Sequence, residues 1–215
     1  MGSVRLNKLV ALIPACELLA DVGCDHGYIG IEALRLGKAK HVAFTDISRP
    51  SLNKARSNCP QQFKDVASFH CQDGLGEIEA DCVIIAGMGG LEIISILKQA
   101  KHLPCKLVLQ PMRNQRDVRI YLTDNYEIVT DVKFFDGKFY DAIVAQKCDN
   151  PTELTESELE FGKTNIQQPS QDFVNFLHLE LNKLNKILEC TSDAEVRARR
   201  KSVEQTLNLV VNKMK

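Results

Sequence analysis

The chain has 215 residues, of which 44% are hydrophobic and 26% are charged. These proportions are ordinary for a soluble globular protein, and the length favours one main domain with a short appendage. The formal net charge of −1 excludes an affinity for nucleic acid that rests on overall charge. Any such contact has to come from local clusters of cations.

The eight cysteines form no CxxC pair and show no metal-ligand spacing with histidine. Several lie inside apolar runs, where cysteine behaves as a small buried hydrophobe. We therefore expect a reducing, cytoplasmic environment and no bound metal. The sequence contains no signal peptide, lipidation motif or apolar run of about 18 residues, so we expect no attachment to a membrane.

The first two thirds of the chain alternate between strands and helices. A leading helix is expected over residues 6–13, before Pro14. Strands are expected at residues 18–23, 41–47, 68–71, 80–86 and 106–109. Helices are expected at residues 26–36, from Ser48, from Leu91 and at 115–124.

A β-hairpin closes this alternating region. Residues 126–135 and 138–147 alternate around Asp136-Gly137, which is typical of two strands joined by a tight turn. Five βα repeats capped by an antiparallel hairpin indicate the methyltransferase variant of the doubly wound sheet. The expected fold class is therefore α/β, a Rossmann-like class I methyltransferase sheet, with a domain over residues 1–149.

The tail, residues 150–215, is expected to be a second, helical domain. Residues 149–160 are polar and acidic, which indicates a linker or an exposed helix. From about Ser170, leucines and valines step by three and four, and Ser192 to Glu195 reads as a capping box. The pattern predicts a C-terminal antiparallel helical hairpin, that is, a short coiled coil.

The turn after the first strand carries the first chemical signal. Gly23-x3-Gly27-x2-Gly30 lets the backbone approach a ligand closely, and Asp21 stands just before it. A carboxylate would repel a pyrophosphate, but Asp21 or Asp25 would attract the amino group of S-adenosylmethionine. This spacing also differs from the G-x-G-x-x-G of dinucleotide sites. We therefore favour a methyl-donor site over a nicotinamide site or an inert domain.

Carboxylates also follow the next two strands. Asp46 and Asp73-Gly74 stand at carboxyl ends, where open α/β sheets bind ligands. Asp46 is suited to accept hydrogen bonds from two ribose hydroxyls, and Asp73 to accept one from an adenine amino group. Further on, the stretch Ala86-Gly87-Met88-Gly89 exposes backbone toward a transferred methyl group, although a tight turn against a helix explains it equally well.

Two clusters of cations could contact RNA. Gln110 and Pro111 follow the fifth strand and are placed to line a planar base. The arginines near them are candidates for phosphate contacts, although solvated helix charges are the commoner explanation of such residues. The tail adds a second, short basic cluster, for which a solubilised helix is the alternative. The expected RNA-binding residues are Arg113, Arg116, Arg119, Arg197, Arg199, Arg200 and Lys201.

The runs DVGCDHGYIGIEAL, FTDIS, QDGL, IAGMGGLEIISIL, LVLQP and FFDGKFYDAIVAQK, in this order, resemble the bacterial TrmK family. The resemblance covers about residues 5–147. It implies a tRNA methyltransferase that uses S-adenosylmethionine to methylate N1 of adenine 22, with a C-terminal coiled coil. The chain departs from the family at Cys24 and Gly27, where serine and alanine are usual, and at Met112, where asparagine is common.

The resemblance also implies roles for individual residues. Those at or beside the methyl donor are Asp21, Gly23, Asp25, His26, Asp46, Ile47, Asp73, Gly74, Ala86, Gly87, Met88 and Gly89, with Gly27 in the same turn. Those that line the target adenine are His26, Tyr28, Met88, Gln110 and Pro111. A lone histidine at a helix start is more often a hydrogen-bond partner of the backbone than a catalyst.

The leading expectation is thus a tRNA (adenine-N1) methyltransferase, acting as a monomer. A different class of function remains open: a donor-binding protein without catalysis that serves as an adaptor for RNA or a partner. A small-molecule methyltransferase is disfavoured, because no separate cap of adequate size lies between the βα units.

Overall fold

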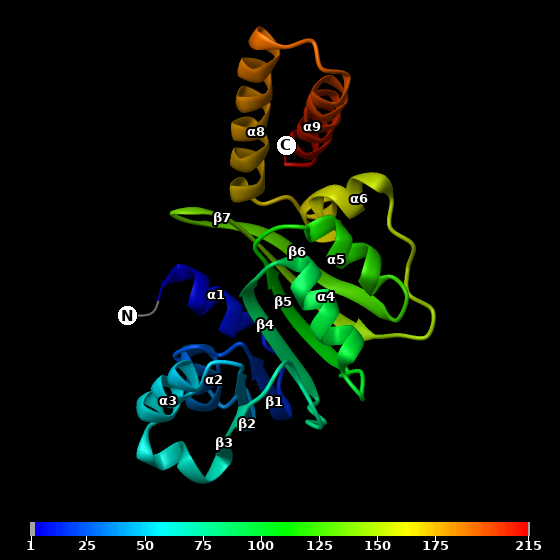
Figure 1. Cartoon of the computed structure of the whole chain (residues 1–215). Coiled ribbons are helices and arrows are strands. Elements are labelled where there is room, and N and C mark those ends of the chain that lie inside the picture. Colours follow the sequence, from blue (N-terminus) through cyan, green and yellow to red (C-terminus); the bar gives the residue numbers. More distant parts are fainter. Residues whose placement is uncertain (1–2, 215) are drawn as a thin grey trace.

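The computed structural model describes residues 3–214 and contains one seven-stranded sheet. The strand order is β3-β2-β1-β4-β5-β7-β6, with β1 to β5 parallel and β7 antiparallel to both of its neighbours (Figure 1). The strands are β1 Cys16–Val22, β2 Ala39–Asp46, β3 Ala67–Cys71, β4 Cys82–Met88, β5 Lys106–Pro111, β6 Tyr126–Asp136 and β7 Lys138–Lys147. The predicted fold class is confirmed.

Helices cover both faces of the sheet. One buried cluster joins the sheet to α1, α2 and α3, and a second cluster on the other face joins it to α4 and α5. These helices are α1 Val4–Leu12, α2 Tyr28–Arg35, α3 Arg49–Asn58, α4 Gly90–Gln99 and α5 Gln115–Leu122, with a 3₁₀ helix η1 at Gln61–Val66. The predicted alternation of strands and helices is therefore confirmed.

The central strands are apolar on both sides, because each face is covered by helices. Residues Cys82 to Ile85 of β4 and Leu107 to Leu109 of β5 are completely buried. Polar groups at the carboxyl ends of these strands are held on a rigid layer.

The β6–β7 hairpin extends past this layer. The last residue of β5 that pairs with β7 is Leu109, opposite Ile143, whereas β6 and β7 stay paired up to Asp136 and Lys138. The start of β7 therefore rises beyond the carboxyl edge of the sheet. Its tip reaches over α1 (Figure 1), where the backbone N–H of Arg5 donates to the carboxylate of Asp136 at 2.9 Å.

Two short helices of the tail, α6 Glu156–Phe161 and α7 Lys163–Gln167, pack against the sheet domain. Strand β6 lies at the edge of the sheet, and such an edge exposes unpaired N–H groups. Three of these groups donate to tail side chains: Asp131 to Thr164 at 2.9 Å, Lys133 to Asn165 at 2.9 Å and Phe135 to Asp172 at 3.1 Å. The stretch expected to be a linker or exposed helix thus helps to finish the sheet.

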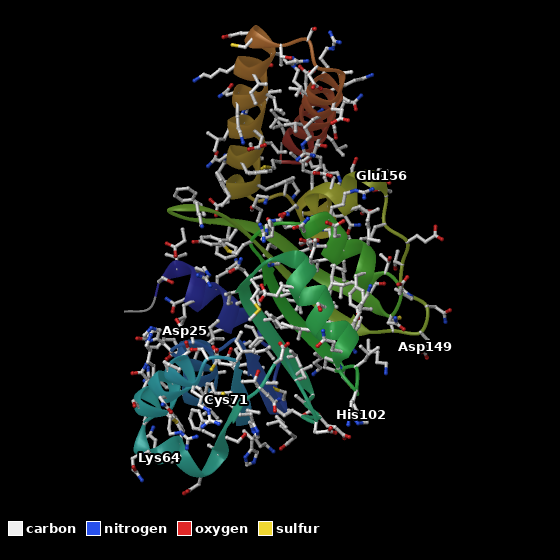
Figure 2. The ribbon with its side chains drawn as sticks, in the orientation of Figure 1. Asp25, Lys64, Cys71, His102, Asp149 and Glu156 are labelled. Carbon is white, nitrogen blue, oxygen red and sulfur yellow. The ribbon has the colours of Figure 1, made fainter. Side chains whose placement is uncertain are left out.

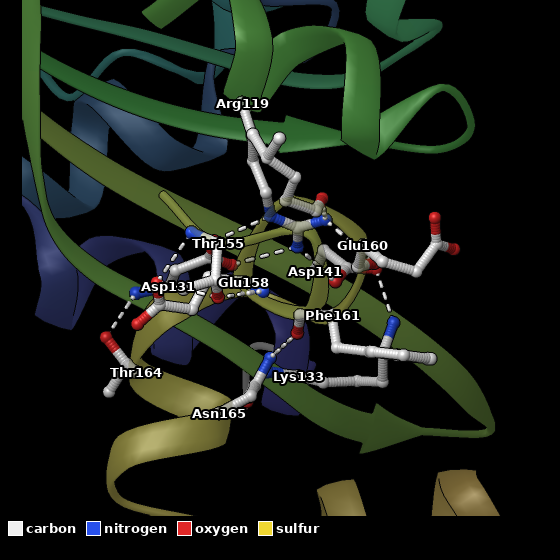
Figure 3. A network of polar contacts seen from close by, with 11 residues as sticks. Arg119, Asp131, Lys133, Asp141, Thr155, Glu158, Glu160, Phe161, Thr164 and Asn165 are labelled. Carbon is white, nitrogen blue, oxygen red and sulfur yellow. Dashed lines mark hydrogen bonds and ion pairs between the residues drawn. The ribbon is translucent and has the colours of Figure 1, made fainter. Parts of the chain in front are cut away.

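A buried polar network lies under α6 (Figure 3). The guanidinium of Arg119 binds Asp131 through two hydrogen bonds, at 2.7 and 3.0 Å, and Asp141 at 3.2 Å. Lys133 completes it with an ion pair to Asp141 at 2.5 Å. Arg119 also donates to two backbone carbonyls near the end of α6, each at 3.2 Å. The network therefore joins α5, β6, β7 and α6.

The last two helices, α8 Gln171–Cys190 and α9 Ala194–Lys213, lie side by side as a hairpin (Figure 1). Their apolar faces form a third buried cluster, which also includes Phe161 and Ile166 from the two short helices. The helical hairpin is as predicted, but α9 is capped by Asp193, whose carboxylate accepts from the N–H groups of Glu195 and Val196, and not by Ser192. None of the described helices is long and apolar enough to cross a membrane.

Candidate active site

The glycine turn joins β1 to α2 and packs tightly against its neighbours. Gly23 and Gly27 have φ values of +66° and +70°, a region that glycine occupies without strain. A Cβ at Gly23 would lie 1.9 Å from Met88, and one at Gly30 would lie 2.4 Å from Phe44. Side chains at these positions would push the turn away from the sheet, so the glycines keep its backbone at the carboxyl edge.

Asp21 lies under this turn and is only 4% exposed. Its carboxylate accepts a hydrogen bond from the backbone N–H of Gly30 at 3.0 Å, which ties the end of β1 to α2. Burial raises the pKa of Asp21 to about 7, against the effect of the Gly30 hydrogen bond, and the nearby charge of Asp46 adds to the increase. The group is therefore poised to change its charge when a cation arrives.

Asp46 fastens the other side of the turn. Its two carboxylate oxygens accept from the backbone N–H groups of Asp25 at 3.0 Å and Ser48 at 2.8 Å. Each carboxylate oxygen has a second lone pair, so Asp46 retains capacity for a ligand hydroxyl. Asp25 has a left-handed φ of 45° and an exposed side chain beside α2, on the side that faces α1 (Figure 2).

A cavity of about 540 Å³ opens beside the turn, which is a usual size for a small-molecule site. It is lined by eight of the residues expected at the donor or the target base: Asp21, Gly23, Asp25, His26, Tyr28, Ala86, Gly87 and Met88. Within residues 3–214 there is no group of three or more histidine, cysteine, aspartate or glutamate side chains placed to hold a metal.

His26 and Tyr28 give the cavity a planar surface. Their rings are stacked, with centroids 5.2 Å apart and planes only 6° apart, and the side chain of Tyr28 is 54% exposed. Stacked, partly exposed rings can receive a flat heterocycle at the mouth of the cavity.

Several expected donor residues lie outside this cavity. Gly27 belongs to the turn, and Gly89 is the N-cap of α4. Asp46 ends β2 and Ile47 follows it, and Asp73 and Gly74 come after β3, farther along the same carboxyl edge. The backbone N–H of Gln72 donates to the carbonyl of Asp46 at 3.1 Å, so the ends of β2 and β3 lie together. The expected roles of these residues remain predictions.

The expectation for Gln110 and Pro111 needs correction. Both are buried, and neither lines the cavity. The amide nitrogen of Gln110 lies 3.2 Å from the sulfur of Met112, and its amide oxygen has no partner among the described residues. The chain turns back after β5, where Met112 donates its N–H to the carbonyl of Met88 at 2.8 Å. Met112 therefore lines the cavity instead.

Arg119 cannot contact RNA as expected, because it is completely buried in the network of Figure 3. Burial alone would lower the pKa of this guanidinium, but Asp131 and Asp141 raise it above its ordinary value. The sequence pattern gave no hint of this, since partners 12 and 22 residues away come together only in the folded sheet.

The other expected RNA contacts fall into two groups. Arg116 pairs with Glu156, Arg199 with Glu160, and Arg200 with Glu204. Arg113, Arg197 and Lys201 are exposed and form no ion pair within residues 3–214. The three residues without an ion pair are better placed to contact RNA phosphates.

Sequence reasoning missed part of the cavity wall. The leading helix was expected only to close the core, and the hairpin only to cap the sheet, because no local pattern shows that they meet over the first turn. The additional lining residues are Ser3, Arg5, Leu6, Leu9, Cys24, Ile29, Met112, Lys138 and Tyr140.

Comparison with known proteins places this geometry in a family. A family model described as a methyltransferase domain matches residues 2–143. A putative tRNA methyltransferase of Mycoplasma genitalium is 31% identical over 169 residues, which are 74% of this chain and 76% of that protein. The tRNA (adenine(22)-N(1))-methyltransferase of Bacillus subtilis is 33% identical over 156 residues, 68% of this chain and 66% of that protein.

A solved structure agrees over nearly the whole length. The M. capricolum TrmK, in complex with the cofactor product S-adenosyl-homocysteine, has a TM-score of 0.87 at 26% identity, covering 97% of this chain and 99% of that chain. The agreement includes the tail that the family model does not reach. The carboxyl-edge cavity, the sequence relatives and the shared fold together show that this chain belongs to the TrmK family of methyltransferases.

Proposed function

We propose that this protein transfers the methyl group of S-adenosylmethionine to N1 of adenine 22 in tRNA. The observation that carries the proposal is the cavity at the carboxyl edge, which joins a glycine turn and two carboxylates to a planar aromatic surface. The named activity of the B. subtilis relative and the cofactor product bound by the M. capricolum TrmK support it.

The residues present fit the methyl donor. The ammonium group of S-adenosylmethionine suits the acidic side of the cavity, where Asp21 and Asp25 lie. We expect Asp46, at the end of β2, to hold the ribose hydroxyls, and Asp73, just after β3, to hold the adenine amino group. Gly23 has a φ of +66°, which glycine adopts without strain, so the turn can bring its bare backbone up to the donor. When bound, the donor supplies a methyl group activated by a positively charged sulfur.

The acceptor base would enter from the side of His26, Tyr28 and Met112. Adenine N1 lies on the edge used for base pairing, so the base has to be unpaired or turned out of its stack. The stacked rings of His26 and Tyr28 would then support its flat face.

The chemistry needs placement rather than a general base. Adenine N1 carries an in-plane lone pair, and its methylated product is a cation that need not lose a proton first. The backbone around Gly87 and Met88 can hold the amino group and keep the ring in line. Positioning of this kind can lower a barrier by about 7 kcal/mol or more.

The His26→Asn variant tests this mechanism. The amide keeps a hydrogen-bonding side chain but loses the ring that stacks on Tyr28, so the variant should keep much of its single-turnover rate and show the pH profile of the parent. A large fall in rate, accompanied by a changed pH profile, would show that His26 acts as a base.

The alternative is a donor-binding adaptor without catalysis. Methyl transfer from radiolabelled S-adenosylmethionine to unmodified bulk tRNA separates the two functions. We expect incorporation that grows with time and enzyme, up to about one methyl group per reactive tRNA. Tight binding of donor and tRNA with no incorporation would favour the adaptor.

A further inference from the structure

Two cations line the active-site cavity in addition to the residues of the glycine turn. Arg5 on α1 and Lys138 at the start of β7 both line it, together with Tyr140. We call these three residues the basic rim. Neither cation forms an ion pair within residues 3–214, and the Nε atom of Arg5 is buried without a hydrogen-bond partner there. The rim therefore holds positive charge that the protein itself does not neutralise.

The fold fixes the position of this charge. The guanidinium carbon of Arg5 lies 5.4 Å from the ring centre of Tyr140, and the ammonium of Lys138 lies 5.3 Å from the same centre. The N–H of Arg5 donates to Asp136, so α1 is fastened to the β6–β7 turn. An aromatic ring that holds two cations beside a cavity reduces the entropy lost when they bind a common anion.

Arg5 also reaches the wall formed by the end of β4. A Cβ at Gly87 would lie 3.1 Å from a terminal nitrogen of Arg5, and Gly87 itself has a φ of +84°. The guanidinium thus approaches the backbone closely because residue 87 has no side chain. This places one cation of the rim next to the stretch where methyl transfer is proposed.

The cavity is consequently divided by charge. Asp21 and Asp25 lie on the side of the glycine turn, and Arg5 and Lys138 lie on the side of the hairpin. The donor carries its ammonium and carboxylate on the same carbon atom. If Asp21 or Asp25 holds the ammonium, the donor carboxylate lies beside it near the glycine turn, and Lys138, which stands on the hairpin, is available to another anion.

Distance across the sheet supports this separation for Lys138, whereas the guanidinium of Arg5 reaches the end of β4, the neighbour of β1. Strand β7 lies three positions from β1 in the strand order. With about 4.8 Å between neighbouring strands, the two strands are roughly 14 Å apart. Beside Lys138, the turn also carries Phe135, which is 49% exposed, in an edge-to-face pair with Phe139. Unpaired cations next to exposed aromatic rings are typical of surfaces that bind single-stranded nucleic acid.

We propose that Arg5 and Lys138 bind a backbone phosphate of the RNA strand whose base enters the cavity. The inference rests on the proposed function, since it assumes that the acceptor is a nucleotide in RNA. Arginine offers two parallel N–H donors to a phosphate, and lysine adds a mobile point charge. The phosphate contact would hold the extruded nucleotide against the methyl donor.

The test compares the full-length variants Arg5→Gln and Lys138→Gln with Lys147→Gln. Lys147 is an exposed residue at the far end of the same strand, so its variant loses the same charge away from the cavity. Three quantities are measured for each: the Kd for unmodified tRNA over a range of salt concentrations, the Kd for S-adenosylhomocysteine, and the melting temperature. Lys138 is exposed, so its variant should fold even if Arg5→Gln does not.

We expect both rim variants to raise the tRNA Kd by about fivefold or more, and to reduce the slope of log K against log salt by up to about one. The Kd for S-adenosylhomocysteine should change by less than about twofold, and Lys147→Gln should match the parent. A rise in the S-adenosylhomocysteine Kd with unchanged tRNA binding would overturn the proposal and assign the rim to the donor carboxylate. No change in either affinity would also overturn it.

A failure of the rim is distinguishable from a failure of the proposed function. The parent enzyme is assayed in parallel for methylation of adenine 22. If the parent methylates that base while the rim variants bind tRNA as it does, only the rim proposal fails. If the parent does not methylate tRNA, the function itself fails, whatever the variants do.

Discussion

Asp21 shows how one buried residue connects folding to ligand chemistry. Its side chain is fixed by Gly30 and almost fully enclosed, and its pKa is raised to about 7. The charged form is thus disfavoured until a cation approaches. An ammonium group in the cavity would favour the ionised carboxylate, so the residue suits the positively charged end of the methyl donor.

This raised pKa predicts how stability depends on pH. The Asp21 carboxyl titrates near its model value of 3.8 in the unfolded chain and near 7 in the folded protein. Binding of a proton to Asp21 therefore stabilises the folded protein fully below about pH 3.8. This stabilisation is lost as the pH rises through about 7. Between pH 5 and pH 7 this loss amounts to roughly 2 kcal/mol.

Urea unfolding of the parent and of Asp21→Asn at a series of pH values measures this contribution. The free energy of unfolding of the parent should fall relative to that of the variant between pH 5 and pH 7, and the difference should be constant above about pH 8. A difference that does not vary with pH would show that Asp21 titrates normally.

Among single residues, the sequence indicated cavity-lining positions where these residues form a local pattern. The turn with Asp21, Gly23 and Asp25 could be identified because its glycines and carboxylates are close together in the sequence. Arg119 and Gln110 could not be placed, since their burial depends on strands that pair across long stretches of chain. Nothing near Arg119 in the sequence distinguishes it from the exposed Arg113.

At the level of elements, the strands, the helices and the β6–β7 hairpin follow from hydrophobic periodicity. The order β5-β7-β6 does not, because it depends on where the hairpin inserts along the edge of β5. Nor does the support that α6 and α7 give to β6. Hydrogen bonds from side chains such as Thr164 and Asn165 to an edge strand leave no periodic signal.

This support changes what a truncation should do. Removing all residues after Asp149 takes away two carbonyl acceptors of Arg119 and the caps of three β6 N–H groups. The ion pairs of Arg119 with Asp131 and Asp141 remain, but each lost hydrogen bond to the buried guanidinium costs about 1.5–3 kcal/mol. We expect the chain 1–149 to unfold at a markedly lower temperature than the chain 1–168, which keeps α6 and α7.

Calorimetric melting of the two truncated chains, each with and without S-adenosylhomocysteine, checks this. The chain 1–168 should melt cooperatively and gain stability from the ligand. Equal melting temperatures for both chains would mean that the sheet domain is complete at Asp149, as the sequence pattern predicted.

At the level of the whole molecule, the cavity lies in the sheet domain. The α8–α9 hairpin projects from the side of that domain where α6 and the β6–β7 hairpin lie (Figure 1). We propose that the hairpin is a second contact for tRNA. Its cations are unequal, because Arg199 and Arg200 pair with Glu160 and Glu204, whereas Arg197 and Lys201 form no ion pair among the described residues.

The double variant Arg197→Gln/Lys201→Gln should therefore weaken tRNA binding and make it less dependent on salt, without changing the melting temperature. The double variant Arg199→Gln/Arg200→Gln is the matched control, and it should lower the melting temperature more than it alters the salt slope. Binding assays at several salt concentrations decide between them. If the first variant leaves the slope of log K against log salt unchanged, Arg197 and Lys201 are solvated charges that do not contact RNA.

The most direct test of the central claim is to map the methylated nucleotide in a tRNA transcript treated with the full-length protein and S-adenosylmethionine. Methylation of N1 blocks base pairing, so primer extension should stop next to position 22, and a transcript with guanine at that position should show no stop. A stop at another adenine, or full-length extension after methyl incorporation, would contradict the proposed function.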